Sequence, residues 1–188
     1  MIKKKHMTEG DLERIHEFLE YAKASAQKGA ALEQEFDQFC VAYDGYWTRY
    51  RVLNDSVKCQ LPEDSSEITE LPECARNCWK LLMFRRKPED IEASVKLLIP
   101  LLKSGEIKSF KHNGDVGKLR ILRYDDEKKR LTAINEATYV IVIYTWGTEE
   151  RDRLKAKLHS IGFTNIPYRR GCKMFESRFG HWKQWFKE

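Results

Sequence analysis

Residues 139–163, YVIVIYTWGTEERDRLKAKLHSIGF, form an apolar strand pattern that leads directly into a helix pattern. The first eight residues, Tyr139–Trp146, are all β-branched or aromatic, which predicts a strand buried on both faces. Gly147 is expected to end this strand and Thr148 to cap the helix, which Gly162 then ends. The stretch therefore predicts a core strand and the helix that covers it.

Short apolar segments on both sides of this stretch predict further strands. They are Phe39–Tyr43, Tyr46–Leu53, Trp79–Phe84, Ile107–Lys111, Leu119–Tyr124 and Asn165–Arg170. Asp44-Gly45, between the first two, is typical of a tight hairpin. Because turns rather than helices join most neighbours, the pattern favours an antiparallel or mixed sheet.

Helical periodicity appears mainly in two regions. The N-terminal helical segment, residues 8–38, is expected to contain a helix capped by Thr8 and a second one over Ala30–Gln38. Another helix is expected to begin at Pro88. Pro100 should kink or end it, although residues 101–103 could form a last irregular turn before Gly105. These patterns predict an α+β domain with helices packed on one face of the sheet.

The length of 188 residues and the hydrophobic fraction of 41% predict one folded domain over residues 7–188. We exclude residues 1–6 as a possible cloning remnant, because His6-Met7 resembles the end of a tag. The acidic stretch 54–75 is expected to be a loop. Apolar runs are too short to cross a bilayer, and no signal peptide is visible, so we expect a cytoplasmic protein without membrane contact.

The formal net charge of +5 permits a phosphate-bearing partner without requiring one. The five cysteines are interpreted as reduced thiols. Cys74 and Cys78 have a spacing that would place both thiols on one face of a helix, but no second pair of ligands completes a zinc site. We therefore expect no metal and no other cofactor.

The order of several segments resembles the basophilic-leukemia-expressed protein family of archaea and eukaryotes. The matching pieces are WKLLMF (79–84), GEIKSFK (105–111), VIVIYT (140–145) and IPYRR (166–170), within the range Cys78–Trp182. The resemblance implies a fold similar to that of the cap-binding translation initiation factor, a curved, mainly antiparallel sheet backed by helices.

The family is more distantly similar to bacterial phosphothreonine lyases, which use a lysine as base and a histidine as acid. If this chain were such an enzyme, Lys111 would remove a proton, and His112 or Tyr144 would donate one. Two departures weigh against this chemistry. The strand 78–82 reads CWKLL and lacks the lyase histidine, and the segment 168–171 reads YRRG and lacks the family's acid.

The resemblance and the residue chemistry coincide at a candidate phosphate pocket on the concave face of such a sheet. Its ligand-binding residues would be Lys111, Tyr144, Tyr168, Arg169 and Arg170. Guanidinium groups and lysine suit phosphate oxygens. The alternative is that the charges are solvated strand ends and that Tyr144 is a core aromatic.

The C-terminal segment 173–187, KMFESRFGHWKQWFK, interleaves basic and aromatic residues. Phe179 and Trp182, together with Trp47 of the predicted hairpin, are candidates for stacking on nucleic-acid bases. The alternatives are that Trp47 lies in the core and that the terminal aromatics dock on the domain or on a protein partner.

These patterns favour a phosphate-recognising module that binds RNA or a nucleotide. A lyase-like enzyme is the alternative, and the absence of a complete catalytic motif weighs against it. A protein-interaction domain is the third reading.

Overall fold

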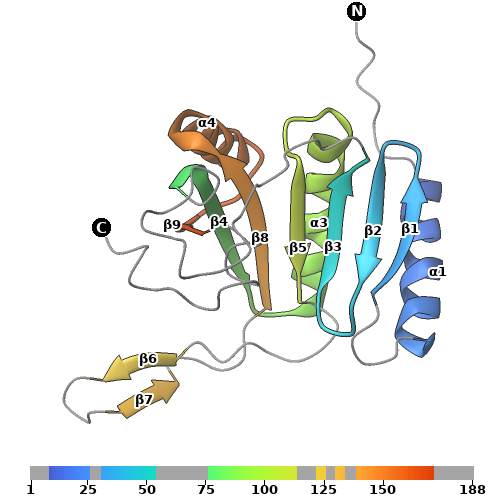
Figure 1. The fold of residues 1–188 in the computed structure, drawn as a ribbon, viewed down its shortest axis with the longest axis horizontal. Coiled ribbons are helices and arrows are strands. Elements are labelled where there is room, and N and C mark those ends of the chain that lie inside the picture. The colour runs from blue at the N-terminus through green and yellow to red at the C-terminus, as the bar shows by residue number, and fades with distance from the viewer. Residues whose placement is uncertain are drawn as a thin grey trace, which may run out of the picture. The chain divides into compact units, whose positions relative to one another are not determined.

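The computed structural model describes residues 9–25, 31–53, 76–113, 122–125, 130–133 and 139–171 (Figure 1). The strands are β1 (Leu32–Phe36), β2 (Phe39–Tyr43), β3 (Thr48–Val52), β4 (Cys78–Arg85), β5 (Ser109–His112), β6 (Leu122–Asp125), β7 (Arg130–Ala133), β8 (Tyr139–Trp146) and β9 (Tyr168–Arg170). The described helices are α1 (Glu9–Ser25), α3 (Pro88–Lys103) and α4 (Gly147–Ser160).

Seven of these strands form one sheet in the order β1-β2-β3-β5-β8-β4-β9, while β6 and β7 form a separate antiparallel pair. The pairs β1–β2, β2–β3, β3–β5 and β4–β9 are antiparallel. Helices pack against the sheet, so the predicted α+β class is confirmed. Among the described helices, none is long and apolar enough to span a membrane.

The described residues fall into two compact units, and the expectation of one domain over residues 7–188 stays a prediction. Unit 1 contains those up to Leu53 and those from Met83 to Val142. Unit 2 contains the described residues between positions 54 and 82 and those from position 143 onward. Each unit carries one of the sites described below.

The predicted hairpin of unit 1 is confirmed as β2 and β3. The side chain of Asp44 accepts hydrogen bonds from the backbone N–H groups of Tyr46 at 3.1 Å and Trp47 at 2.7 Å. Gly45 has a φ of 84°, a conformation that glycine adopts at little cost. The local turn chemistry therefore fixes the register between the two strands.

The helix predicted over Ala30–Gln38 is wrong, because residues Leu32–Phe36 form strand β1, which pairs with β2. Leu32 and Phe36 are four residues apart, a spacing that places them on one face of either a helix or a strand. Pairing with β2 buries Phe36, whose ring lies 5.4 Å from that of Phe39 and is nearly parallel to it. Tertiary pairing thus decides between two structures that the local pattern allows.

Helices α1 and α3 cover the same face of the strands in unit 1 (Figure 1). The core between helices and strands includes Ile15, Phe18, Leu19, Ile91, Val95, Leu98, Phe39, Tyr50 and Phe110. Tyr50 and Phe110 are directly opposite in the β3–β5 register, and their rings stack at 4.4 Å. Burial of each such large side chain contributes about 1.5–3 kcal/mol to folding.

Helix α3 continues past Pro100 to Lys103, which is the alternative of a last turn over residues 101–103 rather than an end at the proline. The ring of Pro100 removes one backbone donor, but its carbonyl still accepts a hydrogen bond from Ser104 N at 3.0 Å. Leu101 and Leu102 in the following turn are buried. Their packing stabilises a last turn that proline alone would disfavour.

In unit 2, the helix after β8 begins two residues earlier than predicted. The N-cap is Trp146, not Thr148, and the backbone N–H of Trp146 donates to the carboxylate of Glu150. At the other end, Gly162 has a φ of 100° and its N–H donates to the carbonyl of His159. The predicted glycine stop is therefore confirmed, while the predicted threonine cap is not.

Candidate nucleic-acid interface

A pair of aromatic rings in unit 2 bridges strands β4 and β9. Trp79 is opposite Arg170 in the register, and Leu81 is opposite Tyr168, so all four side chains share one face. The rings of Trp79 and Tyr168 meet edge to face at 5.5 Å. Trp79 is only 4% exposed, whereas Tyr168 is 42% exposed. The pair thus has one buried ring and one that solvent reaches.

Helix α4 places Arg151 over both rings. Its guanidinium carbon lies 4.3 Å from the centre of the Trp79 ring and 4.2 Å from that of Tyr168. Asp152 accepts two hydrogen bonds from the same guanidinium, at 2.8 and 3.0 Å. These bonds lower the pKa of the exposed Asp152 carboxyl. Arg151 therefore contacts both rings and pairs with Asp152 at the same time.

Two further cations flank the ring pair. Lys155, one helical turn after Arg151, places its ammonium 5.0 Å from the centre of the Tyr168 ring. The guanidinium of Arg170 lies 5.1 Å from the centre of the Trp79 ring. Cation–π contacts of this kind each contribute about 0.5–1 kcal/mol at exposed sites. We call Trp79, Tyr168, Arg151, Lys155 and Arg170 the aromatic–basic cluster.

The opposite face of the same strands carries a second group. Lys80 is opposite Arg169 in the β4–β9 register, so the two side chains point to the same side. The ammonium of Lys80 lies 5.9 Å from the centre of the Tyr144 ring, although the lysine is largely buried. Within unit 2, the predicted ligand-binding residues are therefore divided. Tyr168 and Arg170 belong to the aromatic–basic cluster, and Tyr144 and Arg169 lie on the other face.

Lys111, the fifth predicted ligand-binding residue, lies in unit 1 on β5. Its ammonium is 3.9 Å from the centre of the Trp47 ring, and it is opposite Arg49 in the register. The predicted convergence of Lys111 with the four residues of unit 2 stays a prediction, as does its role as a lyase base.

Lys111 and His112 do not converge in the way an acid–base pair would require. Successive residues of a strand point to opposite faces. Lys111 contacts Trp47, whereas His112 lies on the helix-covered face, where its Nε2 is 3.4 Å from the hydroxyl of Tyr50. This geometry favours separate roles for the two side chains.

Of the three predicted stacking residues, only Trp47 falls within the described part of the chain. It is half-buried, and Tyr46 meets it edge to face at 5.2 Å. Lys111 lies over its ring, so that Trp47 already has a cationic neighbour. Phe179 and Trp182 lie outside the described residues.

Sequence reasoning missed three members of the cluster, namely Trp79, Arg151 and Lys155. A partial signal was present, because Arg151 and Lys155 are four residues apart and must share a face of the predicted helix. The sequence pattern did not reveal which face meets β9.

Cys74, one of the two cysteines considered for zinc, lies outside the described residues.

Among the described residues, no group of three or more His, Cys, Asp or Glu side chains is arranged to hold a metal ion. Comparisons with protein-family models, curated proteins and solved structures found no match. The resemblance to the basophilic-leukemia-expressed protein family therefore stays a prediction.

Proposed function

We propose that unit 2 binds single-stranded RNA, with a base stacked on Tyr168 and phosphates held by neighbouring basic side chains. The observation that carries the proposal is the exposed Tyr168 ring beside Arg151 and Lys155, at 4.2 and 5.0 Å. An aromatic ring next to cations is the arrangement by which proteins bind single strands with little sequence preference.

The charges around this ring support a polyanionic ligand. Lys155 and Arg170 belong to the cluster, and Arg169 lies between Tyr168 and Arg170 on the other face of the exposed strand β9. Arg151 is the cluster cation that Asp152 pairs with. Lysine and arginine gain binding free energy from RNA mainly through release of counterions from the phosphates.

The binding of a fluorescein-labelled oligouridylate, measured by fluorescence anisotropy, tests this proposal. Tyr168→Ala should weaken binding by about 5- to 160-fold, because stacking on a ring contributes ~1–3 kcal/mol per base. Arg169→Ala combined with Arg170→Ala should weaken binding and reduce the slope of log K against log salt by about 1–2, since up to two phosphate contacts are lost.

The control is Arg153→Ala, which removes one arginine charge from α4. Arg153 is exposed and two residues from Arg151, so it points away from the rings. It should change the affinity far less than the β9 variants. The proposal is wrong if the oligouridylate does not bind, if binding does not depend on salt, or if Arg153→Ala has the same effect as the Arg169 and Arg170 changes.

A further inference from the structure

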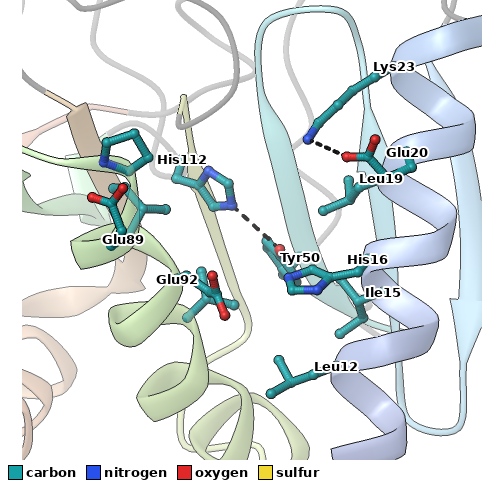
Figure 2. Close-up of a pocket in the computed structure, with 13 residues that line it drawn as sticks. Leu12, Ile15, His16, Leu19, Glu20, Lys23, Tyr50, Glu89, Glu92 and His112 are labelled. Carbon is teal, nitrogen blue, oxygen red and sulfur yellow. Dashed lines mark hydrogen bonds and ion pairs between the residues drawn. The ribbon is translucent and has the colours of Figure 1, made fainter.

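A pocket in unit 1 lies between α1 and α3, over strands β3 and β5 (Figure 2). Its volume of about 390 Å³ falls in the range of roughly 300–1,000 Å³ that is typical of small-molecule sites. All of its lining residues belong to unit 1. The pocket is therefore separate from the aromatic–basic cluster of unit 2.

Part of the pocket wall is apolar. Leu12, Ile15 and Leu19 line it from α1, and Ile91 and Val95 line it from α3. Apolar walls favour a ligand with a hydrocarbon or aromatic body, because such a body leaves water when it binds.

The polar residues of the two helices that line the pocket are predominantly acidic. Glu20, Glu89 and Glu92 contribute carboxylates, while Lys23 contributes an ammonium that pairs with Glu20 at 3.2 Å. Lys96, outside the lining, pairs with Glu92 at 2.8 Å. This hydrogen bond, more than the charges of Lys96 and nearby His16, lowers the pKa of the Glu92 carboxyl.

The floor carries two buried polar groups. His112 is 5% exposed and Tyr50 is 2% exposed, and His112 Nε2 lies 3.4 Å from the Tyr50 hydroxyl. Figure 2 shows both side chains between the two helices. Polar groups at the bottom of an apolar cavity orient a ligand that carries a matching donor or acceptor.

We propose that this pocket binds an organic amine with an aromatic body. The ring system lies against the leucine, isoleucine and valine side chains, and the ammonium lies toward Glu89 and Glu92. A ring N–H or hydroxyl of the ligand reaches the His112–Tyr50 pair. The same pocket disfavours organic anions, because its lining holds three carboxylates against one lysine and two histidines, His16 and His112.

Isothermal titration calorimetry with three indole compounds of similar size tests the preference. Tryptamine carries an ammonium, tryptophol is neutral, and indole-3-acetate is an anion. Tryptamine should bind at least about tenfold more tightly than indole-3-acetate, the difference expected from one charge-assisted contact. Tryptophol should fall between them.

Two pairs of variants locate the binding site. Val95→Phe fills the pocket and should abolish tryptamine binding, whereas Leu97→Phe on the exposed side of α3 should leave it unchanged. Glu92→Gln should weaken the binding of tryptamine by about threefold or more and leave the binding of tryptophol unchanged, because the substitution removes only the charge of the side chain. Glu17→Gln, which removes an exposed charge of α1 outside the pocket, is its control.

The exposed Glu92 variant keeps the test valid if the buried Val95 variant does not fold. Absence of tryptamine binding, equal binding of indole-3-acetate, or unchanged tryptamine binding in Glu92→Gln would each overturn the proposal. None of these results bears on RNA binding by unit 2, because the two sites share no residue.

Discussion

Cys40 is a fully buried thiol on β2 beside Arg51 and Glu33. Burial is the largest influence on it and raises its pKa from the usual 9.0 to about 11, although the charge of Arg51 acts in the opposite direction. Because the thiolate is the reactive form, Cys40 should be inert toward alkylation in the folded protein near neutral pH.

This pKa shift predicts a dependence of stability on pH. Above pH 9.0 the unfolded chain loses the Cys40 proton, while the folded chain keeps it up to about pH 11. The stabilising contribution is thus complete below pH 9.0 and is lost progressively as the pH rises toward 11. Urea unfolding of the protein and of Cys40→Ala over this range should show a smaller alkaline loss in the variant. If the free energy of unfolding fell with pH equally in the two proteins, the raised pKa of Cys40 would be contradicted.

At the scale of the element, α4 ends in a turn that needs glycine. Gly162 has a φ of 100°, and the next N–H, that of Phe163, donates to the carbonyl of Leu158 at 3.0 Å. A Cβ at position 162 would meet no atom within 4 Å, so a substitution there costs backbone strain alone.

Gly162→Ala should therefore lower the free energy of unfolding by about 1 kcal/mol, measured by urea denaturation. The control is Gly10→Ala in the first turn of α1, where φ is not positive and a Cβ also meets no atom within 4 Å. That change should be neutral or raise the free energy by up to about 1 kcal/mol, since alanine has the higher helix propensity. A loss of stability at both positions would show that the end of α4 has no special requirement for glycine.

Elements differed in how well the sequence predicted them. Strand β8 was predicted with its observed bounds, because eight consecutive strand-forming residues leave no alternative. Strand β1 was mistaken for a helix, because its five residues suit either periodicity until β2 pairs with them. The continuation of α3 beyond Pro100 depends on buried leucines whose packing no local rule describes.

At the scale of the molecule, an ion pair joins the start of α1 to the end of α3. The Lys103 ammonium lies 2.5 Å from the Asp11 carboxylate, and these side chains are only 7% and 17% exposed. Lys103 also lies 6.0 Å from the centre of the Phe39 ring. A contact between residues so distant in sequence holds the two helices of unit 1 together at one end.

A double-mutant cycle with Asp11→Ala and Lys103→Ala should give a coupling energy of about 1–3 kcal/mol, because the pair is mostly shielded from water. The exposed pair Glu92–Lys96 on α3, with both side chains 46% exposed, is the control. Its coupling should be about 0.3–0.5 kcal/mol. Equal coupling for the two pairs would mean that burial adds nothing to the first.

The candidate sites were only partly predictable. The sequence selected Tyr168 and Arg170 as ligand-binding residues, and the structure places both beside Trp79. It also grouped them with Arg169, which lies on the opposite face because neighbouring residues of a strand alternate. The unit 1 pocket had no signal at all, because its lining comes from four separate elements.

By itself, the sequence determined the α+β class, the β2–β3 hairpin, the core strand β8 and the glycine that ends α4. Each of these depends on periodicity or turn chemistry over a few neighbouring residues, where local sterics and hydrogen bonding act. Only the tertiary structure decided that Arg151 lies over Trp79 and Tyr168, and that His112 lines a cavity whereas Lys111 lies over Trp47. Such contacts arise from strand register and helix docking, which are set by the packing of the whole core.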